Sequence, residues 1–429
     1  MNSRKSERSA RSDAWLLLLL TILNVLNVVD RMLLSSFANY IVPDLQLTNT
    51  EFGLLTGLIF LIFYSVMGLF MGMLADTMNR TRLIAAGVAL WSILTAVSGM
   101  AKGFISLAIP RMFIGIGEAV MTPSAMSIIA DRFPEHRLGF VSGIYYMGAP
   151  IGGGLSLLLA GYLGPVIGWR ACFYLLGGIG ILLAAIMFLT KETPRRSFAK
   201  VDLSVDTLPL TSVVRTTFRI IVRSPALMLT IAGGTIFHIL LGSTFFDQLW
   251  FVNERGYERD EIAQLTGWLV LAGGIIGCFL GGIGGDRLMT KTGLGRPAFL
   301  CIIMIIFSPF VFAFRLSEEG SIWIPIGMFF SVVQMGAIFG PIFATIQELA
   351  PAQVRATTVA LTIMSFNIVG LGIGITGTGI AVDWVISQGW EQPYSIVILT
   401  ATLFSYLAVP CFYWSGLWFK RDKDLLNST

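Results

Sequence analysis

GMLAD at residues 72–76 and GGIGGD at residues 281–286 share one spacing, in which a glycine precedes an aspartate by four positions. Each copy follows the second apolar run in its half of the chain. A further match sets Pro123, Ile128 and Arg137 against Pro341, Ile346 and Arg355 at a constant offset of 218. Two separate matches of this kind indicate that the chain consists of two related halves.

Around these motifs the chain is a series of long apolar runs. Hydrophobic residues make up 55% of the 429 residues and charged residues only 13%, whereas a soluble protein carries about 25%. A membrane span needs about 20 apolar residues. We therefore predict spans near 14–41, 52–75, 83–101, 105–131, 138–163, 169–190, 226–252, 262–285, 297–315, 321–349, 354–380 and 393–419. The first run is too long and too charged for a cleaved signal peptide, so we expect it to be retained.

The expected fold class is an all-α membrane protein with 12 transmembrane helices in two pseudo-symmetric six-helix bundles. A polar stretch divides the halves, which predicts an N-terminal bundle at 1–190, a linker at 191–225 and a C-terminal bundle at 226–429. In the linker, arginines recur every fourth residue and apolar residues fall roughly opposite them: Arg215, Arg219 and Arg223 against Leu210, Val214, Phe218 and Ile221. This pattern predicts an amphipathic helix on the membrane surface, serving either as a tether or as a lipid-binding element.

Basic residues predict the orientation of the chain. With both termini inside, 22 of the 29 Lys and Arg residues fall in inner segments and 5 in outer ones. This asymmetry predicts a multi-pass protein of the cell membrane with both termini cytoplasmic. The net charge of +4 belongs to that inner surface, and nucleic acid is not an expected partner. The four cysteines lie singly, so we expect neither a disulfide, a metal site nor a cofactor.

Four ionisable residues interrupt the apolar runs: Asp30, Arg31, Arg111 and Glu118. A charge at the bilayer centre costs about 3 kcal/mol and usually marks function. Arg111 and Glu118 are two helical turns apart and share a face. Burial favours a neutral carboxyl group and a nearby cation favours a carboxylate. We interpret Glu118, Asp30 and Arg111 as proton-coupling residues, and a permanent Arg111–Glu118 salt bridge is the alternative.

A polar stripe accompanies these charges on the first span, where Asn24, Asn27, Arg31 and Ser35 recur at helical spacing. Arg31 could grip a phosphate or carboxylate through two hydrogen bonds, or it could pair with Asp30. In the second half, His238 is either a proton relay or a hydrogen-bonded packing residue. We expect substrate contacts at Arg31, Arg111, Asn24, Asn27, Glu118, His238 and Gln334.

The doubled motif resembles the loop signature of the major facilitator superfamily, G-x-x-x-D-[RK]-x-G-[RK]-[RK]. Gly72, Asp76 and Arg80 match this signature, whereas Thr77, Asn79 and Thr81 depart from it. The resemblance implies alternating access, with a mid-membrane substrate site and an inner gate where the aspartate meets a helix N-terminus. The gate residues implied are Asp76, Arg80, Arg137, Asp286 and Arg287.

Two runs carry a narrower resemblance, to the spinster subfamily: NVVDRMLLS at residues 27–35 and IPRMFIGIGEAVMTPSAMSIIADRFP at residues 109–134. This resemblance implies proton-coupled export of amphiphilic lipids such as sphingolipids or lysophospholipids. GAPIGGGL at residues 148–155 is similar to the antiporter signature G-P-x-x-G-G, with Ala149 replacing the first glycine. The match favours export, and close helix packing is the alternative reading of these glycines.

The sequence therefore predicts a proton-coupled secondary transporter that exports an amphiphilic or anionic substrate as a monomer in the lipid bilayer. Two alternatives stay open, a symporter or uniporter of small organic anions and a non-transporting membrane receptor. The chain contains no H-E-x-x-H, G-x-S-x-G or Walker A motif, so we do not expect an enzyme.

Overall fold

The computed structural model describes residues 2–134, 137–195, 210–351 and 354–427. Within these residues the secondary structure is helical and contains no strand, and 12 helical segments are long and apolar enough to cross a membrane. The predicted all-α fold class is confirmed. The spans are Ser12–Ser36, Asn49–Thr77, Arg80–Ser98, Phe104–Arg132, Leu138–Tyr162, Gly164–Leu189, Pro225–Arg255, Arg259–Thr292, Pro297–Leu316, Trp323–Leu349, Thr357–Ser387 and Pro393–Leu425.

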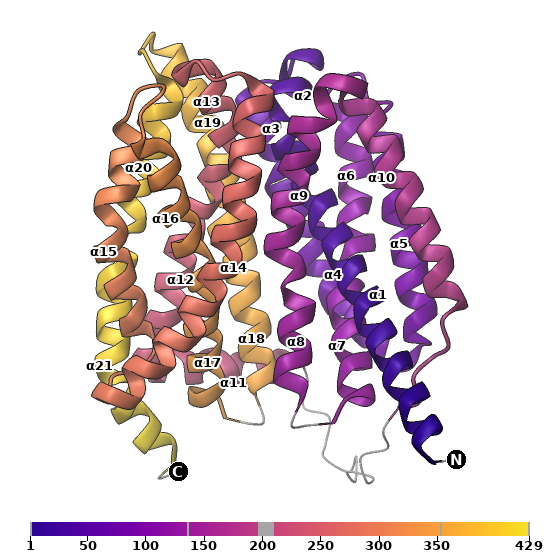
Figure 1. The fold of residues 1–429 in the computed structure, drawn as a ribbon. Coiled ribbons are helices and arrows are strands. Elements are labelled where there is room, and N and C mark those ends of the chain that lie inside the picture. Colours follow the sequence, from indigo (N-terminus) through magenta and orange to yellow (C-terminus); the bar gives the residue numbers. More distant parts are fainter. Residues whose placement is uncertain (1, 135–136, 196–209, 352–353, 428–429) are drawn as a thin grey trace. The chain divides into compact units, whose positions relative to one another are not determined.

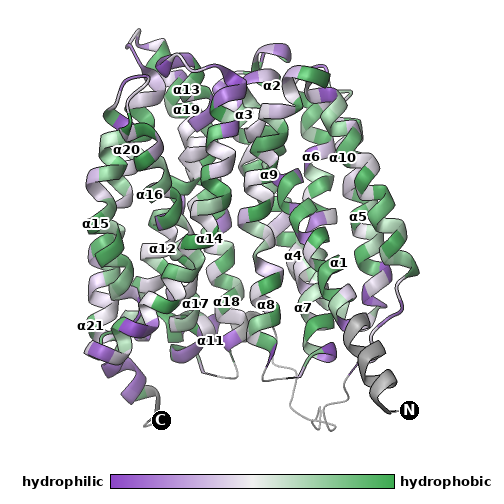
Figure 2. Cartoon of the chain, in the orientation of Figure 1, coloured by the Kyte–Doolittle hydropathy of each residue, from purple (hydrophilic) through white to green (hydrophobic). Residues whose placement is uncertain are grey.

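The chain forms two compact units. Unit 1 comprises Met1–Leu47, Ile59–Val201 and Arg259–Gly267, and unit 2 comprises Thr48–Leu58, Asp202–Glu258 and Trp268–Thr429. We call the end of a unit at which its first span begins the proximal end, and the opposite end the distal end. Along the helices, hydrophobic residues dominate the middle and hydrophilic residues gather toward the ends (Figure 2). This distribution is expected of helices that cross a bilayer.

The helices of unit 1 are coloured from indigo to magenta in Figure 1. They are α1 (Asn2–Ser36), α2 (Ala38–Asp44), α4 (Leu58–Thr77), α5 (Arg80–Ser98), α6 (Phe104–Glu118), α7 (Met121–Arg132), α8 (Leu138–Tyr146), α9 (Gly148–Tyr162) and α10 (Gly164–Leu189). The sixth span starts at Gly164 instead of residue 169, and Gly168 kinks it with φ of 77°. Glycine tolerates this conformation. The predicted start at residue 169 therefore coincides with the kink and not with the beginning of the helix.

Unit 2 contains the remaining helices. They are α3 (Asn49–Thr56), α11 (Leu210–Arg223), α12 (Pro225–Ser243), η2 (Thr244–Phe246), α13 (Asp247–Arg255), α14 (Arg259–Thr292), α15 (Pro297–Leu316), α16 (Trp323–Ala337), α17 (Phe339–Leu349), α18 (Arg355–Met364), η3 (Ser365–Gly372), α19 (Ile373–Ser387), α20 (Pro393–Ser405) and α21 (Ala408–Asn427). The first nine residues of α14 belong to unit 1. A helix is present at 210–223 as predicted, whereas the linker residues 196–209 lie outside the described residues.

Two spans in each unit are interrupted at equivalent positions. The fourth span breaks at Ala119 and Val120 and the tenth at Ile338, while the fifth breaks at Met147 and the eleventh becomes a π-helix at Ser365. Val120 and Ile338, like Met147 and Ser365, are 218 positions apart, which is the offset of the sequence repeat. The repeat therefore extends to the helix breaks. Such breaks free backbone groups that a membrane protein must satisfy internally.

In unit 2, the N-terminus of α3 is held by Asp383 of α19. One carboxylate oxygen accepts hydrogen bonds from the backbone N and side-chain Nδ2 of Asn49, at 3.2 and 2.8 Å. The other accepts from the backbone N and Oγ1 of Thr50, at 2.7 and 2.6 Å. A helix N-terminus carries free N–H groups and the positive end of the helix dipole. The carboxylate of Asp383 therefore both accepts hydrogen bonds from these N–H groups and neutralises the dipole charge.

At the distal end of unit 1, Asp44 connects α2 to α10. Its carboxylate accepts a hydrogen bond from Arg170 and another from Trp169 Nε1, the latter at 3.0 Å. The Arg170 guanidinium holds the pKa of Asp44 below its usual range. The pair is partly exposed, so it contributes little to stability beyond fixing the position of this turn.

Candidate functional site

The four ionisable residues predicted from the first and fourth spans come together inside unit 1. Asp30 and Arg31 lie on α1, and Arg111 and Glu118 lie on α6. Asp30, Arg111 and Glu118 retain only 4%, 3% and 1% of their exposure, whereas the side chain of Arg31 is 23% exposed. Two acids and two bases thus share one buried cluster, and Arg31 is its most accessible member.

Glu118 is paired with Arg31. Nε of Arg31 donates to Oε2 of Glu118 at 3.2 Å, and Nη2 of Arg31 donates to Oδ1 of Asn27 at 3.2 Å. Oε1 of Glu118 is buried without a hydrogen-bond partner. The ion pair therefore differs from the Arg111–Glu118 bridge that the sequence suggested. Glu118 is the last residue of α6, directly before the helix break, and this places its carboxylate beside α1.

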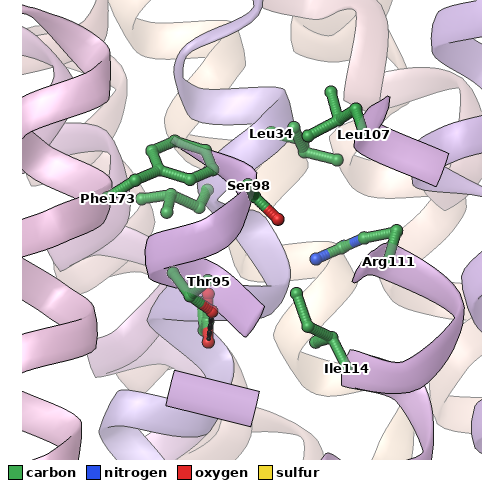
Figure 3. A pocket seen from close by; sticks show the side chains of 9 residues that line it. Leu34, Thr95, Ser98, Leu107, Arg111, Ile114 and Phe173 are labelled. Atoms are coloured by element: carbon green, nitrogen blue, oxygen red, sulfur yellow. Dashed lines mark hydrogen bonds between the residues drawn. The ribbon is translucent and has the colours of Figure 1, made fainter. Parts of the chain in front are cut away.

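Arg111 instead lies beside Asp30 in a small pocket of unit 1. Nη2 of Arg111 donates to the backbone O of Arg31 at 2.8 Å, and Thr95 Oγ1 donates to Asp30 Oδ2 at 2.6 Å. In Figure 3, Arg111 points into the pocket from α6, and Ser98 and Thr95 line it from α5. Nε of Arg111 is buried without a partner. The two acids thus have different immediate neighbours, a hydroxyl group for Asp30 and a guanidinium for Glu118.

Two aromatic rings on α4 cover the arginines. Cζ of Arg111 lies 4.4 Å from the ring centre of Phe60, and Cζ of Arg31 lies 4.3 Å from that of Tyr64. A Cβ on Gly115 would lie 3.0 Å from the backbone O of Phe60, so this glycine permits α6 to approach α4. Sequence reasoning missed these rings, although their i, i+4 spacing in a span was a usable signal.

The polar stripe on α1 is divided between two roles. Asn27 contacts Arg31, whereas Nδ2 of Asn24 donates to the backbone O of Tyr145 at 2.8 Å. Tyr145 precedes the break at Met147, so Asn24 satisfies a carbonyl group near the break. Ser35 bonds within its own helix, to Met32 O. Asn24 therefore contacts α8, away from the charge cluster.

The glycines of the fifth span allow α9 to pack closely against α1. A Cβ on Gly152 would lie 2.7 Å from the backbone O of Val25 and 2.7 Å from the side chain of Val28. This geometry supports the packing interpretation of the GAPIGGGL run.

In unit 2, the two predicted polar residues lie in separate surroundings. Nδ1 of His238 is 2.7 Å from the backbone O of Gly234, and its ring stacks on Phe366 of the π-helix with centres 4.2 Å apart. Gln334 is 4% exposed with Oε1 unpartnered, in a pocket of otherwise apolar residues. A π-helix frequently marks a functional position, so His238 remains a candidate functional residue.

A second buried ion pair was not anticipated. Arg315 is 3% exposed and binds Asp247 through two hydrogen bonds of 2.7 and 3.1 Å. Its guanidinium also lies 5.0 Å from the ring centre of Trp250. Asp247 begins α13 after the η2 turn, so it stands at a helix N-terminus. The pair ties α13 to the distal end of α15.

At the proximal end of unit 1, Arg80 is fully buried in a network of acceptors. It donates to Glu192 Oε1 at 2.8 Å, to Ser127 Oγ at 2.9 Å, to Thr193 O at 2.7 Å and to Asp131. Arg80 was predicted as a gate residue, and the structure places it inside unit 1. Two other predicted gate residues of this unit, Asp76 and Arg137, are exposed.

The start of the linker completes this network. Nη2 of Arg195 donates to the backbone oxygens of Ala75 and Met78, at 2.8 and 2.9 Å, and Nη1 donates to that of Asp76. Glu192 accepts from the backbone N of Thr81 at 3.0 Å. The linker thus caps the C-terminus of α4 with a cation and the N-terminus of α5 with an anion, as the helix dipoles favour.

Unit 2 contains a related network at its proximal end. Arg296 donates to Asp286 at 2.6 Å and to Glu348, and Lys423 donates to Glu348 at 2.7 Å. Arg287, also predicted for the gate, is exposed. Arg296 stands ten residues after the repeated aspartate, and Arg80 four residues after its own, so spacing alone did not reveal the equivalence.

Among the described residues, no group of three or more His, Cys, Asp or Glu side chains could hold a metal ion. The polar chemistry of unit 1 is therefore that of carboxylates, guanidinium groups, amides and hydroxyls. Such a set can bind an anion and exchange protons.

Twelve spans in two repeated units, with a buried charge cluster in one of them, define a polytopic membrane transporter. Residues 20–375 match the family model described as Major Facilitator Superfamily. The chain belongs to this family, whose members are transporters.

Individual relatives agree with this assignment. The chain is 26% identical over 402 residues to an MFS-type efflux pump of Mycolicibacterium smegmatis, covering 92% of this chain and 90% of the relative. It is 24% identical over 399 residues to the probable sphingolipid transporter spinster homolog 2 of Arabidopsis thaliana, covering 90% and 79%. The fold matches the crystal structure of a bacterial homolog of the human lysosomal transporter Spinster, with TM-score 0.80, 24% identity and coverage of 96% and 98%. The resemblance to the spinster subfamily is confirmed.

Proposed function

We propose that the protein is a proton-coupled secondary transporter of the cell membrane, with both termini cytoplasmic, that exports an amphiphilic lipid of the sphingolipid or lysophospholipid class by alternating access. The observation that carries this proposal is the buried carboxylate of Glu118. One of its oxygens is held by Arg31 and the other has no partner. A carboxyl group in this position can take up a proton at the free oxygen while its cation partner is released.

Protonation of Glu118 removes the charge that attracts Arg31. The guanidinium of Arg31 is then available to an anionic group, and its partial exposure gives such a group access. Asp30 is the second proposed proton site, with Arg111 as the neighbouring cation. A proton or a substrate shifts the balance between two states only if it binds them with different affinity, and the Glu118–Arg31 pair supplies that difference.

The proposed substrate carries an anionic or zwitterionic head group. Arg31 and Arg111 are two cations in one buried cluster, and arginine binds phosphate and carboxylate groups through paired hydrogen bonds. In unit 2, His238 and Gln334 are the proposed polar contacts. The efflux activity named for the M. smegmatis relative and the sphingolipid named for the Arabidopsis relative support export and a lipid.

We further propose that the protein acts as a monomer, with bundles at 1–190 and 226–429 on either side of the linker. Its gate consists of Asp76, Arg80, Arg137, Asp286 and Arg287. Because Arg80 is bonded within unit 1, its proposed role is to fix the loop that presents Asp76.

A second candidate is a symporter or uniporter of small organic anions. The same two arginines favour it, since a guanidinium binds a short carboxylate as readily as a lipid phosphate. Competition separates the two candidates, because a lysolipid and a short organic acid share the head-group charge and differ in the acyl chain.

The experiment that tests the proposed function is transport by the purified protein in proteoliposomes under an imposed pH gradient. We expect a lysophospholipid or sphingoid phosphate to cross the membrane in the direction opposite to the flow of protons, with little inhibition by short organic acids. Gradient-driven movement of a short organic acid that lysolipids do not inhibit would favour the second candidate. Ligand binding without any flux would point to a receptor.

A further inference from the structure

The helix α11, between the two sets of spans, rests on unit 2 by one edge. Thr217 is fully buried, and Ile221, one turn later, packs against the hydrophobic core of the unit. The main contacts of α11 are with α12 and α18. Its last residue, Arg223, is followed by Ser224, which caps the first turn of α12. The helix is therefore held at the proximal end of unit 2, where the first span of that unit begins.

Two exposed strips run side by side along residues 215–223 of α11. One consists of Phe218 and Val222, which are 64% and 50% exposed. The other consists of the exposed residues Arg215, Arg219 and Arg223. The sequence pattern had put Phe218 on the side opposite the arginines, but Phe218 lies next to the buried edge and remains exposed. The side chains of Leu210 and Val214, also assigned to the apolar side, lie outside the described residues.

The order of these strips is the one required at a membrane boundary. From the buried edge outward, the surface of α11 changes from apolar to cationic within one helical turn. In water, Phe218 and Val222 would remain hydrated at a cost, and in the hydrocarbon core the arginines would be desolvated. Only the interface between acyl chains and head groups satisfies both strips at once.

We propose that α11 is a binding surface for anionic phospholipid head groups, with Phe218 and Val222 in the acyl boundary and the three arginines on the lipid phosphates. The positive charge of this surface favours an anionic lipid as its ligand. Three guanidinium groups on one strip attract anionic lipids, and each binds phosphate oxygens through paired hydrogen bonds. The inference is independent of the transported substrate, since every residue in it lies outside the charge cluster of unit 1.

The test uses the full chain in nanodiscs of mixed phosphatidylcholine and phosphatidylglycerol, with the lipids retained by the protein identified by native mass spectrometry. The double variant Arg215→Gln/Arg219→Gln removes two charges from α11. The matched control, Lys291→Gln/Lys420→Gln, removes two exposed charges from α14 and α21 of the same unit. We expect the arginine variant to retain phosphatidylglycerol about 30-fold more weakly, and the control to retain it as the wild type does.

Equal losses in the two double variants would overturn the proposal, because any exposed charge would then serve. Unchanged retention in the arginine variant would also overturn it and leave α11 as a solvated tether. A second measurement needs no variant: amide hydrogen exchange of residues 215–223 in the wild type. Exchange should be slower in phosphatidylglycerol than in phosphatidylcholine nanodiscs, and the difference should disappear at high salt. Identical exchange in both lipids would contradict the assignment.

Discussion

Glu118 of α6 accepts a hydrogen bond of 3.2 Å from Arg31 of α1, across 87 positions of the chain. The bond joins the end of a broken helix to the helix that carries the second acid, Asp30. Arg111, two turns before Glu118 on the same helix, is turned to Asp30 and the backbone of Arg31. Arg31 therefore bonds the carboxylate of Glu118, whereas Arg111 bonds the backbone beside Asp30. This difference makes the proposed coupling testable one residue at a time.

Substrate binding should depend on pH through Arg31. When Glu118 is neutral it no longer holds the guanidinium, so an anionic head group gains a charged hydrogen-bond donor. We expect lysolipid affinity to rise about tenfold from neutral to mildly acidic pH. The measurement is equilibrium binding of a labelled lysolipid to the detergent-purified protein. Arg31→Ala should bind weakly at both pH values, whereas Arg111→Ala should keep the pH dependence. A pH response that survives in Arg31→Ala would refute this assignment.

Arg80 should be a major determinant of the stability of unit 1. Arg80→Ala leaves the carboxylates of Asp131 and Glu192 without their buried cation, and we expect a loss of about 3 kcal/mol. Arg82→Ala is the matched control, because Arg82 is two residues away and exposed. Thermal unfolding followed by intrinsic fluorescence should show a clear decrease in Tm for the first variant and little change for the second. Equal decreases would mean that the network is not structural.

The proposed gate predicts a shift in conformational balance. Asp76→Asn and Arg137→Ala remove exposed charges from the proximal end of unit 1, and we expect both to favour the inward-open state. Spin labels, one on each unit at the proximal end, should report longer distances by double electron–electron resonance in both variants. Distances equal to those of the wild type would mean that this end of unit 1 has a packing role and is not a gate.

The N-terminus of α3 should depend on Asp383. Asp383→Ala removes the four hydrogen bonds that Asn49 and Thr50 donate to its carboxylate. The Thr48–Glu51 capping box remains, so we expect a loss of about 1.5 kcal/mol from these bonds to a charged group. Amide exchange of residues 49–56 should become about tenfold faster, since their opening requires less free energy. Glu391→Gln, an exposed charge change at the same end of unit 2, serves as the control. Unaltered exchange in Asp383→Ala would show that packing alone holds α3.

The sequence predicted the spans and the residues of the charge cluster because both follow from the cost of burying charge in a bilayer. The pairing within the cluster depends on where α6 ends. Pro123, four residues after Ala119, has no N–H to bond to the Ala119 carbonyl and so favours a break there, but this proline was interpreted only as part of the repeat. The contact of Phe60 and Tyr64 with the arginines was missed despite their i, i+4 spacing, since most aromatics in spans contact lipid. The burial of Arg315 was not predicted, because a charge near a span end is ordinarily solvated unless its partner, Asp247, is known to be close.

The linker network was missed for a different reason. Glu192 and Arg195 lie in a polar stretch, where charges are ordinarily solvated, and only the structure shows that they cap α5 and α4. A charged residue that follows a span directly is thus a candidate helix cap as well as a topological signal.

The central claim, that Glu118 carries the coupling proton, is tested most directly by Glu118→Gln in proteoliposomes. Two fluxes are compared: substrate movement driven by a pH gradient, and exchange of labelled for unlabelled substrate at equal pH. A glutamine keeps the size of the side chain but cannot exchange a proton, so the first flux should vanish while exchange persists. Glu261→Gln, an exposed acid on α14, should leave both fluxes unchanged. Gradient-driven flux at the wild-type rate in Glu118→Gln would contradict the account.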